Sequence, residues 1–412
     1  MAIVVQKFGG TSVADAEKIR RAAGRALKAH SEGHQVVVVA SARGKQTDQL
    51  VADALELNPN PPKREMDMLL STGEQQTVSL MAMALEAMGQ KAISFTGQQV
   101  QMVTDAAHGK ARIQNIGAER IRESLDAGHI CIVAGFQGVD DEGNITTLGR
   151  GGSDTSAVAL AAALGAGTCE IYTDVDGIYS TDPRKYPNAV KMEQISYDEM
   201  LELASLGAGV MHGRAIEFGK KYDVTIHVRS SMDDSTGTLI THEVPQMEGI
   251  VVSGATSQKD LAKIALIGLT NTPGNAAGVF AHLAGSNVSV NDIIQTEVNS
   301  EKATLSFTVA RSDLDVAKQA IEDIRKQIDC ESVFIREDIA EVSVVGVGMR
   351  SHCGVAENMF KALSANKVNI DSITTSEIRI SCLVDLADAD RALIAVCDAF
   401  ELDKPAAQRA QP

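Results

Sequence analysis

The sequence predicts an α/β protein with two parts, an N-terminal domain with a mainly parallel central sheet flanked by helices and a C-terminal pair of similar α/β units. Three observations support this prediction. Short apolar runs alternate with longer helical patterns over the first part of the chain, which is typical of a parallel sheet. The last part contains an internal repeat at an offset of 80 residues. The length of 412 residues, at roughly 150 residues per domain, corresponds to two or three domains.

The first part alternates expected strands with expected helices. The strands are Ile3–Phe8, Val36–Ala40, Ile130–Gly135 and Glu170–Thr173. The helices are Val13–His30, Gly73–Met88 and Ala118–Ala127, and the proline-rich stretch Asn58–Pro62 is a turn between two helices. Continuous apolar runs such as Val36–Ala40 are typical of buried parallel strands, and ligands of such sheets bind at the carboxyl ends of the strands.

The repeat occupies the last part of the chain. Gly274 in the first copy matches Gly354 in the second, and the helices expected after them are Ala276–Ala284 and Val355–Ala365. Each copy reads as a strand, a glycine turn, a helix and a strand. Copies of this size have small cores, so we expect them to pack on each other or on copies from another chain. The polar, turn-rich stretch Ser230–Gly249 separates the two parts.

Composition and charge exclude several classes of function. The chain has 38 Lys and Arg residues and 54 Asp and Glu residues, and the resulting net charge of −16 argues against a nucleic-acid partner. Its six cysteines form no C-x-x-C pair and no cluster with histidine, which predicts reduced thiols in a cytoplasmic protein. We expect no membrane span and no signal peptide, because no apolar run reaches ~18 residues and the first strand soon becomes polar.

A first glycine-rich loop, KFGGTS at Lys7–Ser12, follows the first strand. Glycines let the backbone approach a ligand closely, and the start of the next helix attracts an anion. Thr11 or Ser12 is the expected helix cap, with Asp15 as its capping-box partner. Lys7 adds a positive charge. The loop is not a Walker A motif, since its lysine precedes the glycines, and an ordinary strand–turn–helix connection is the alternative interpretation.

A second glycine-rich loop, GRGGSD at Gly149–Asp154, opens an alanine-rich helix. Arg150 provides a planar fork suited to a carboxylate or a phosphate. Asp154 is a candidate for holding Mg²⁺ or for orienting Lys7, and the alternative is a simple helix N-cap.

A third stretch, Tyr172–Arg184, leaves a strand and runs through several tight turns. Asp174 and Asp176 fail the spacing of a calcium loop, so a loop that wraps a nucleotide base and ribose is the better interpretation, with an ordinary loop as the alternative.

Two anion-binding loops and a nucleotide loop on one sheet predict a phosphoryl-transfer site. Such a site aligns donor and acceptor and neutralises developing charge, which Lys7, backbone N–H groups and Mg²⁺ would do. The sequence contains no triad-like Ser, His and Asp grouping and no pair of histidines at metal-ligand spacing, so no metal-ligand cluster is predicted.

These motifs, together with STGEQ at Ser71–Gln75 and the weaker MHGRAIE at Met211–Glu217, resemble those of aspartate kinases in order and spacing. The 80-residue repeat resembles the paired ACT regulatory domains of the same family. The resemblance implies an amino-acid-kinase catalytic domain at residues 1–235, a linker at 236–260, and two βαββαβ ACT domains at 261–335 and 341–405. It also implies phosphorylation of the β-carboxylate of L-aspartate by ATP with Mg²⁺, the first step toward lysine, threonine and methionine.

The resemblance also assigns roles to individual residues. It implies catalytic roles for Lys7 and Asp154 and substrate contacts for Thr47, Glu74, Arg150, Gly151, Gly152 and Ser153, with Glu74 on the ammonium and Arg150 on the α-carboxylate. It implies nucleotide contacts for Lys7, Phe8, Gly9, Gly10, Ser41, Thr173, Asp174, Tyr179, Asp182 and Arg184. It implies effector contacts for Asn271, Gly274, Ala276, Asn291, Gln295, Asn369, Ile370, Thr375 and Ser376.

The chain departs from the family pattern at several positions. Arg43 stands where the family has Met, and Gly213 where Pro is common. Asn271 and Asn291 replace aspartates at the effector positions, and Asp292 follows where the family has Met. An effector's ammonium gains more from a carboxylate than from an amide, so these changes predict altered effector recognition.

The expected partners are an amino-acid effector, lysine and/or threonine, and further chains joined through the ACT domains as a homo-oligomer or an α2β2 assembly. Whether Met247 starts a separate small subunit stays open, and a scaffold without effector binding is the alternative for the repeat. Alternatives for the whole chain are a kinase acting on glutamate or an acetylated amino acid, and an inactive amino-acid sensor. A dehydrogenase suggested by Gly346 and Gly348 is weak, since the third glycine is missing.

Overall fold

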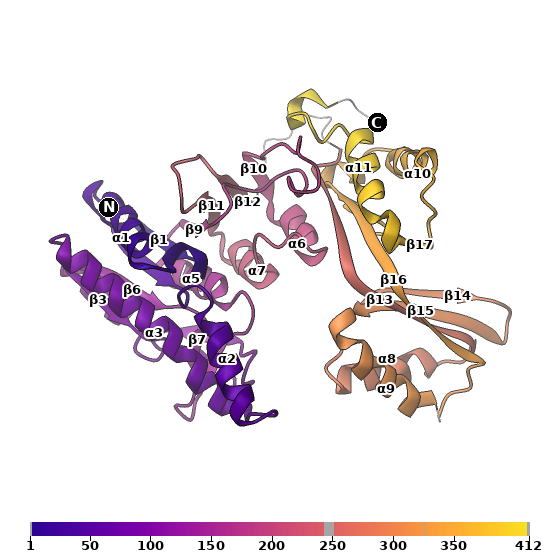
Figure 1. Ribbon diagram of the computed structural model, residues 1–412, viewed down its shortest axis with the longest axis horizontal. Coiled ribbons are helices and arrows are strands. Elements are labelled where there is room, and N and C mark those ends of the chain that lie inside the picture. The colour runs from indigo at the N-terminus through magenta and orange to yellow at the C-terminus, as the bar shows by residue number, and fades with distance from the viewer. Residues whose placement is uncertain (1, 243–250, 326, 410–412) are drawn as a thin grey trace. The chain divides into compact units, whose positions relative to one another are not determined.

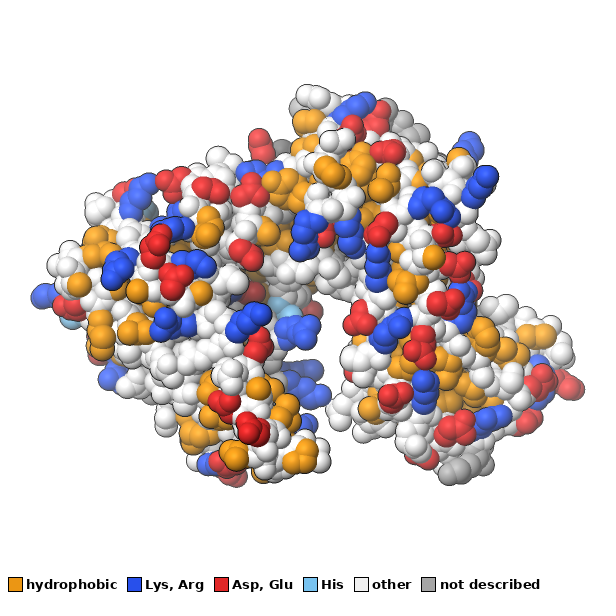
Figure 2. All heavy atoms as spheres, in the orientation of Figure 1, with side chains coloured by type: hydrophobic (Ala, Val, Ile, Leu, Met, Phe, Trp, Pro, Cys, Tyr) orange, Lys and Arg blue, Asp and Glu red, His pale blue; other side chains and the backbone are white. Residues whose placement is uncertain are grey.

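The computed structural model describes residues 2–242, 251–325 and 327–409 (Figure 1). The chain forms two compact units. The first unit comprises Met1–Tyr179 and Lys191–Pro245, and the second comprises Ser180–Val190 and Gln246–Pro412. Acidic and basic side chains are interspersed over the visible surface of both units (Figure 2). Among the described residues, no helix has the length and apolarity that a membrane span requires. All six cysteines are free thiols.

The first unit is built on an eight-stranded sheet with the order β10-β12-β11-β9-β1-β2-β6-β3. Its strands are β1 (Ile3–Phe8), β2 (Gln35–Ala40), β3 (Ala92–Phe95), β6 (Ile130–Ala134), β9 (Thr168–Thr173), β10 (Gln194–Ser196), β11 (Thr225–Ser230) and β12 (Thr238–Thr241). Every neighbouring pair is parallel except β11 and β12, so the predicted, mainly parallel sheet is confirmed. Strand β12 lies within the range that the sequence analysis gave to a linker.

Helices cover both faces of this sheet. The helices of the unit are α1 (Ala16–Ser31), α2 (Gln46–Leu57), α3 (Lys63–Ala87), α4 (Glu119–Asp126), α5 (Gly152–Leu164), α6 (Tyr197–Ser205) and α7 (Gly213–Tyr222). Val36 and Val38 of β2 share a buried core with α1 and α3. Alternate side chains of a strand point to opposite faces, and α5 packs on the other face, where Val39 lies near Gly135. A small sheet of β4 (Met102–Thr104), β5 (Ile113–Ile116), β7 (Gln137–Val139) and β8 (Ile145–Thr147) completes the unit.

Two helix starts differ from the prediction. Helix α1 begins at Ala16, and its cap is Asp15, whose carboxylate accepts a hydrogen bond from the N–H of Lys18. Thr11 and Ser12 instead belong to a separate 3-10 turn, Gly10–Val13, so the prediction of a cap at these two residues was wrong. Helix α3 begins well before the predicted Gly73. That glycine lies inside the helix, at a point where a Cβ would come 2.8 Å from the Ala42 side chain, so the close approach of the two segments requires glycine.

The second unit contains one six-stranded sheet with the order β14-β15-β13-β16-β18-β17. Its strands are β13 (Gly254–Thr270), β14 (Val290–Glu297), β15 (Lys302–Ala310), β16 (Ser332–Val345), β17 (Ser372–Thr375) and β18 (Arg379–Asp385), all paired antiparallel. Its helices are α8 (Asn275–Gly285), α9 (Leu314–Arg325), α10 (Val355–Ala365) and α11 (Ala389–Ala399). Gly274 and Gly354 cap α8 and α10 with φ of 104° and 98°, so the repeat places the same left-handed glycine before each helix.

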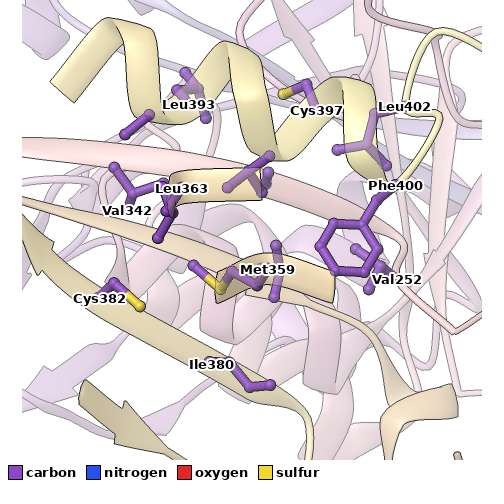
Figure 3. Packing of buried hydrophobic residues seen from close by; sticks show 14 of the residues in the cluster. Val252, Val342, Met359, Leu363, Ile380, Cys382, Leu393, Cys397, Phe400 and Leu402 are labelled. Carbon is purple, nitrogen blue, oxygen red and sulfur yellow. The ribbon is translucent and has the colours of Figure 1, made fainter. Parts of the chain in front are cut away.

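The two copies of the repeat share their longest strands. β13 and β16 run side by side along their lengths (Figure 1), with Gly254 opposite Val345 and Ile267 opposite Ser332. Within the described residues, no strand follows α11, and the first half of β13 takes the place of that strand beside β16. The fold class is therefore confirmed, but the second βαββαβ unit is not continuous in sequence. Its core of β16, α10 and α11 residues, including Val342, Met359 and Leu393, is shown in Figure 3.

Residues Ser180–Val190 belong to the second unit although they lie inside the predicted catalytic range. Tyr186 is part of the core of the second copy, and its hydroxyl donates to the Asp398 carboxylate over 2.7 Å. The Ser180 hydroxyl donates to the carbonyl of Leu402 over 2.7 Å. The chain therefore leaves the first unit after Tyr179 and returns to it at Lys191.

Two methionines of α3 form a matched pair for testing the core. Met81 is fully buried and Met83 is 65% exposed. Because Met81→Ala leaves a cavity between α3 and the sheet, we expect it to lower the free energy of unfolding of the first unit by about 2–5 kcal/mol. Met83→Ala, the control, should change it by less than about 0.5 kcal/mol. Urea unfolding of both variants gives the comparison, and equal effects would contradict this packing.

Candidate active site

The candidate site lies at the carboxyl edge of the parallel sheet, where β1, β2, β6 and β9 end together. Lys7, next to last in β1, is 8% exposed and points its ammonium toward α5. Its Nζ lies 2.5 Å from Oδ1 of Asp154, in the first turn of that helix. The residue at the N-cap is Gly151, so the helix-cap alternative for Asp154 was wrong. The structure thus brings both predicted catalytic residues together.

The first glycine loop is held between β9 and the loop after β2. The Gly9 N–H donates to the Tyr172 carbonyl over 3.2 Å, and the Gly44 N–H donates to the Gly10 carbonyl over 2.9 Å. A Cβ on Gly10 would lie 2.7 Å from the Ala42 carbonyl oxygen, so only glycine allows this close approach. A Cβ on Gly9 would lie 3.6 Å from the Lys7 ammonium, which places that charge over the loop.

Phe8 has a different environment from the one that a nucleotide contact suggests. Its ring is fully buried and stacks on Tyr172, with ring centroids 4.8 Å apart. Any contact of Phe8 with a nucleotide therefore involves its backbone. The neighbouring Ser41 N–H donates to the Phe8 carbonyl over 3.1 Å and so joins the end of β2 to the first glycine loop.

The second glycine loop adopts the conformation that glycines permit. Gly149 and Gly151 have φ of 77° and 68°, in the left-handed region. A Cβ on Gly151 would overlap the His212 side chain, so this position requires glycine for space as well. Gly152 and Ser153 then begin α5, and the Gly152 N–H donates to the Gly149 carbonyl over 2.9 Å, which closes the loop onto the start of the helix. Arg150 is exposed beside them.

Glu74 projects from the buried face of α3 and is 3% exposed. Its Oε1 accepts a hydrogen bond from the Ala42 N–H over 3.0 Å, and among the described residues its Oε2 has no hydrogen-bond partner. Desolvation raises the pKa of Glu74 to about 7, against the lowering effect of the Ala42 hydrogen bond. A cation placed against Oε2 would favour the ionised carboxylate. The side chain is therefore suited to an ammonium group.

Two further residues of interest follow β2, the substrate candidate Thr47 and Arg43. Thr47 lies in the first turn of α2. Arg43, the departure from the family pattern, donates from Nη2 to the Ala14 carbonyl over 3.3 Å. This contact directs its guanidinium to the backbone before α1.

The third stretch is divided between the two units. Thr173, Asp174 and Tyr179 lie in the first unit, and the Thr173 hydroxyl donates to Asp174 over 3.1 Å. Asp182 and Arg184 lie in the second unit and bind each other, with Nε–Oδ1 and Nη2–Oδ2 distances of 3.0 and 2.9 Å. The first unit alone therefore does not bring all predicted nucleotide residues together.

The effector candidates lie on the edge strands of the second unit and beside them. Asn291 and Gln295 are exposed on β14, and Thr375 is exposed on β17. Strands β14 and β17 are the first and the last strand of the six-stranded sheet. They nevertheless contact each other, because Asp292 of β14 accepts a hydrogen bond from the Thr374 hydroxyl of β17 over 3.0 Å. The remaining candidates lie at the start of α8 (Asn271, Gly274, Ala276) and around β17 (Asn369, Ile370, Ser376).

Sequence reasoning missed two charged residues near the second glycine loop, the buried Asp67 and the half-buried Arg214. Asp67 lies seven residues before Glu74 on the same buried face of α3. That spacing was a usable signal, because residues seven apart share a helix face. Arg214 was noted only within a weak motif.

Comparison with known proteins shows which families the two parts of the chain match. The model of the amino acid kinase family matches residues 2–230, and that of an ACT domain matches residues 342–400. An aspartokinase of Bacillus sp. (strain MGA3) is 47% identical over 402 residues, which cover 98% of each chain. The chain belongs to the aspartokinase family. Aspartokinases are ATP-dependent phosphotransferases, so the resemblance and the enzyme class predicted from the motifs are confirmed.

Two solved structures of E. coli aspartokinase III resemble this aspartokinase chain. The complex with aspartate and ADP has a TM-score of 0.83 at 28% identity and covers 97% of this chain and 100% of that one. The complex with lysine and aspartate has a TM-score of 0.76 at 26% identity, covering 96% and 99%.

Glu74 makes stability depend on pH. Its folded pKa of about 7 lies above the ordinary 4.5, so the stabilising contribution of the protonated form is lost as pH rises from 4.5 through 7. Glu74→Gln cannot ionise. We therefore expect it to raise the free energy of unfolding at pH 8 by about 1–3 kcal/mol and to be neutral at pH 5.

Urea unfolding at the two pH values measures this difference. Glu65→Gln is the matched control, since Glu65 lies on the same helix with its side chain 60% exposed. A Glu74→Gln effect that is the same at pH 5 and pH 8 would contradict the role of burial.

Proposed function

We propose that this chain transfers the γ-phosphoryl group of ATP to the β-carboxylate of L-aspartate and releases ADP and 4-phospho-L-aspartate. The observation that supports it most directly is the Lys7–Asp154 pair between two glycine loops at the carboxyl edge of the sheet. The related E. coli aspartokinase III binds aspartate and ADP, and its fold matches almost the whole chain. A carboxylate oxygen attacks the γ-phosphorus while the bond to the β-phosphate oxygen breaks.

The two glycine loops divide the work in this proposal. The first loop and Lys7 bind the transferring phosphoryl group, and Asp154 holds the Lys7 ammonium in place. Arg150 binds the α-carboxylate of the amino acid, and the unpartnered Oε2 of Glu74 binds its ammonium. With the ammonium and the α-carboxylate both held, the side-chain carboxylate is directed at the nucleotide. The reaction step then no longer carries the entropy cost of bringing the two reactants together.

Mg²⁺ would enter with the nucleotide. Magnesium sites in kinases use one or two carboxylates together with substrate phosphates, and the ion neutralises charge on those phosphates. Among the described residues, no group of three or more acidic, cysteine or histidine side chains forms a dedicated metal site. Asp154, in the first turn of α5, is the carboxylate that would share the ion with the phosphates.

Glu74 separates this proposal from a kinase that acts on an acetylated amino acid. Such a substrate has no ammonium group and would leave the buried carboxylate without a partner, which is costly. Turnover of aspartate, but not of N-acetylated amino acids or glutamate, is the expected specificity. Amino-acid binding without turnover would instead favour the inactive sensor.

Lys7 is the first residue to test. We expect Lys7→Ala to lower kcat by about 10²–10³-fold, because one preorganised cation at the developing charge is lost. ADP release coupled to a second enzyme, with aspartate, ATP and Mg²⁺, measures the rate. Lys28→Ala, at an exposed lysine of α1, is the control and should retain the wild-type rate. Wild-type turnover no higher than that of Lys7→Ala would refute the proposal.

Feedback control belongs to the same proposal: lysine and/or threonine binds at the edge strands β14 and β17, and further chains join through the second unit. The E. coli relative with lysine and the exposed candidates on both strands support it. The product would serve the synthesis of lysine, threonine and methionine in the cytoplasm. The candidate internal start at Met247, which would give an α2β2 assembly, lies outside the described residues.

Asn291→Asp tests the effector site. We expect it to lower the inhibitor concentration for half-maximal effect by about tenfold, since a charge-assisted hydrogen bond to an ammonium replaces a neutral one. Rates are measured with lysine, threonine and both together. Asn299→Asp, in the hairpin after β14, is the control and should leave inhibition unchanged. A wild-type rate that neither amino acid changes would overturn the feedback proposal.

A further inference from the structure

Asp67 is a buried carboxylate with three hydrogen-bond donors around it. Its Oδ1 accepts from the Thr147 hydroxyl over 2.5 Å and from the Gly109 N–H over 3.1 Å. Its Oδ2 lies 2.8 Å from Nδ1 of His108, and because a carboxylate only accepts, that ring nitrogen carries the proton. The residue is 1% exposed. Asp67 of α3 therefore joins the loop at 105–111 to the end of β8.

Arg214 binds the same junction from another helix. From the start of α7 its Nη1 donates to the Leu148 carbonyl over 2.6 Å, and its Nη2 donates to the Ala111 carbonyl over 2.9 Å. The Ala111 N–H in turn donates to the Thr147 carbonyl over 2.9 Å. The planar guanidinium fits two carbonyl groups at once, which a lysine ammonium at this position would not.

Both contacts act on the residues from which the second glycine loop begins. Thr147 and Leu148 directly precede Gly149, where a Cβ would lie 2.9 Å from the Gly109 carbonyl oxygen. The loop at 105–111 therefore lies against the glycine loop, and Asp67 and Arg214 hold these segments together. Neither residue belongs to the substrate or nucleotide contacts assigned above.

We infer that Asp67 and Arg214 are positioning residues, which set the place of the second glycine loop and, through it, of Arg150. The inference rests on the proposed function, in which this loop holds the amino acid. Asp67 and Glu74 share the buried face of α3 and are separated by about 10 Å along the axis at 1.5 Å per residue. Helix α3 thus supports the binding of both charged groups of the amino acid, the ammonium directly through Glu74 and the α-carboxylate through Asp67 and the loop of Arg150.

The positioning role predicts different effects on KM for aspartate and KM for ATP. Loss of either residue should weaken the binding of the amino acid while the site of the first glycine loop, which is held by Tyr172 and Gly44, stays intact. KM for aspartate should then rise, and KM for ATP should stay nearly constant. A general loss of structure would instead lower the active fraction and leave both KM values unchanged.

Thr147 offers a nearly isosteric test. We expect Thr147→Val, which removes the hydroxyl bound to Asp67, and Asp67→Asn each to raise KM for aspartate by about tenfold, because the loop that carries Arg150 loses a hydrogen bond that holds it in place. Thr147→Ser keeps the hydroxyl and should stay within about twofold of wild type. Arg214→Lys should resemble Asp67→Asn. Glu65→Gln, on the exposed side of α3, is the control.

A double-mutant cycle then separates positioning from simple destabilisation. If Asp67 acts through the loop that carries Arg150, Arg150→Ala should hide most of the Asp67→Asn effect on KM for aspartate. Additive effects in this cycle, or equal rises of KM for ATP and aspartate, would overturn the inference. So would a Thr147→Ser variant as impaired as Thr147→Val.

Hydrogen exchange provides a readout that does not require activity. Asp67→Asn should speed exchange of the Gly109 amide and of amides in the second glycine loop, relative to Glu65→Gln and to amides of the first loop. If the wild-type protein does not turn over aspartate but Asp67→Asn still speeds exchange at these amides, the proposed function is refuted and the positioning role stands. Unchanged exchange in an active enzyme would refute the positioning role alone.

Discussion

The site depends on one ion pair, that between Lys7 and Asp154. Lys7 is nearly buried at the end of β1, and a buried charge is tolerated only with a partner. The partner comes from the first turn of α5, so the pair joins the central strand of the sheet to the helix that begins at the second glycine loop. The two loops, far apart in the sequence, are held at a fixed separation by this contact. Phosphoryl transfer requires such a fixed separation, because its catalysis is mostly alignment and charge neutralisation.

Helix α3 adds a second constraint on the same edge. Its buried face carries two carboxylates among apolar residues, and each binds a different loop beside the site: Glu74 the loop after β2, and Asp67 the segment before the second glycine loop. Buried carboxylates are costly, and the raised pKa of Glu74 reflects that cost. Because both carboxylates lie on one helix, that helix fixes the distance between the groups that bind the ammonium and the α-carboxylate of the substrate in the proposed function.

Two long strands, β13 and β16, join the two copies of the repeat into one sheet. β13 and β16 each contribute to both copies of the repeat, so neither copy has a complete sheet without the other. A polar layer lies between the copies, where Asp292 meets Thr374 and Arg379, and burial together with Asp292 raises the pKa of Glu341 to about 7. This layer connects the strands that carry the effector candidates Asn291 and Thr375. A shift of either strand on effector binding would therefore alter contacts in both copies of the repeat.

The sequence by itself determined the parallel sheet, the glycine loops and the repeat, because apolar runs, glycines at strand ends and equal spacing are local patterns. It also predicted Lys7 and Asp154 as site residues from the glycine-rich loops, and Glu74 through the resemblance of STGEQ to aspartate kinases. Only the tertiary structure decided the partners of Asp67 and Arg214, the use of β13 by both copies, and the place of Ser180–Val190 in the second unit. The physical reason is that these features depend on contacts between segments distant in sequence. The seven-residue spacing places Asp67 on the same face of α3 as Glu74, but it does not identify the residues that bind Asp67.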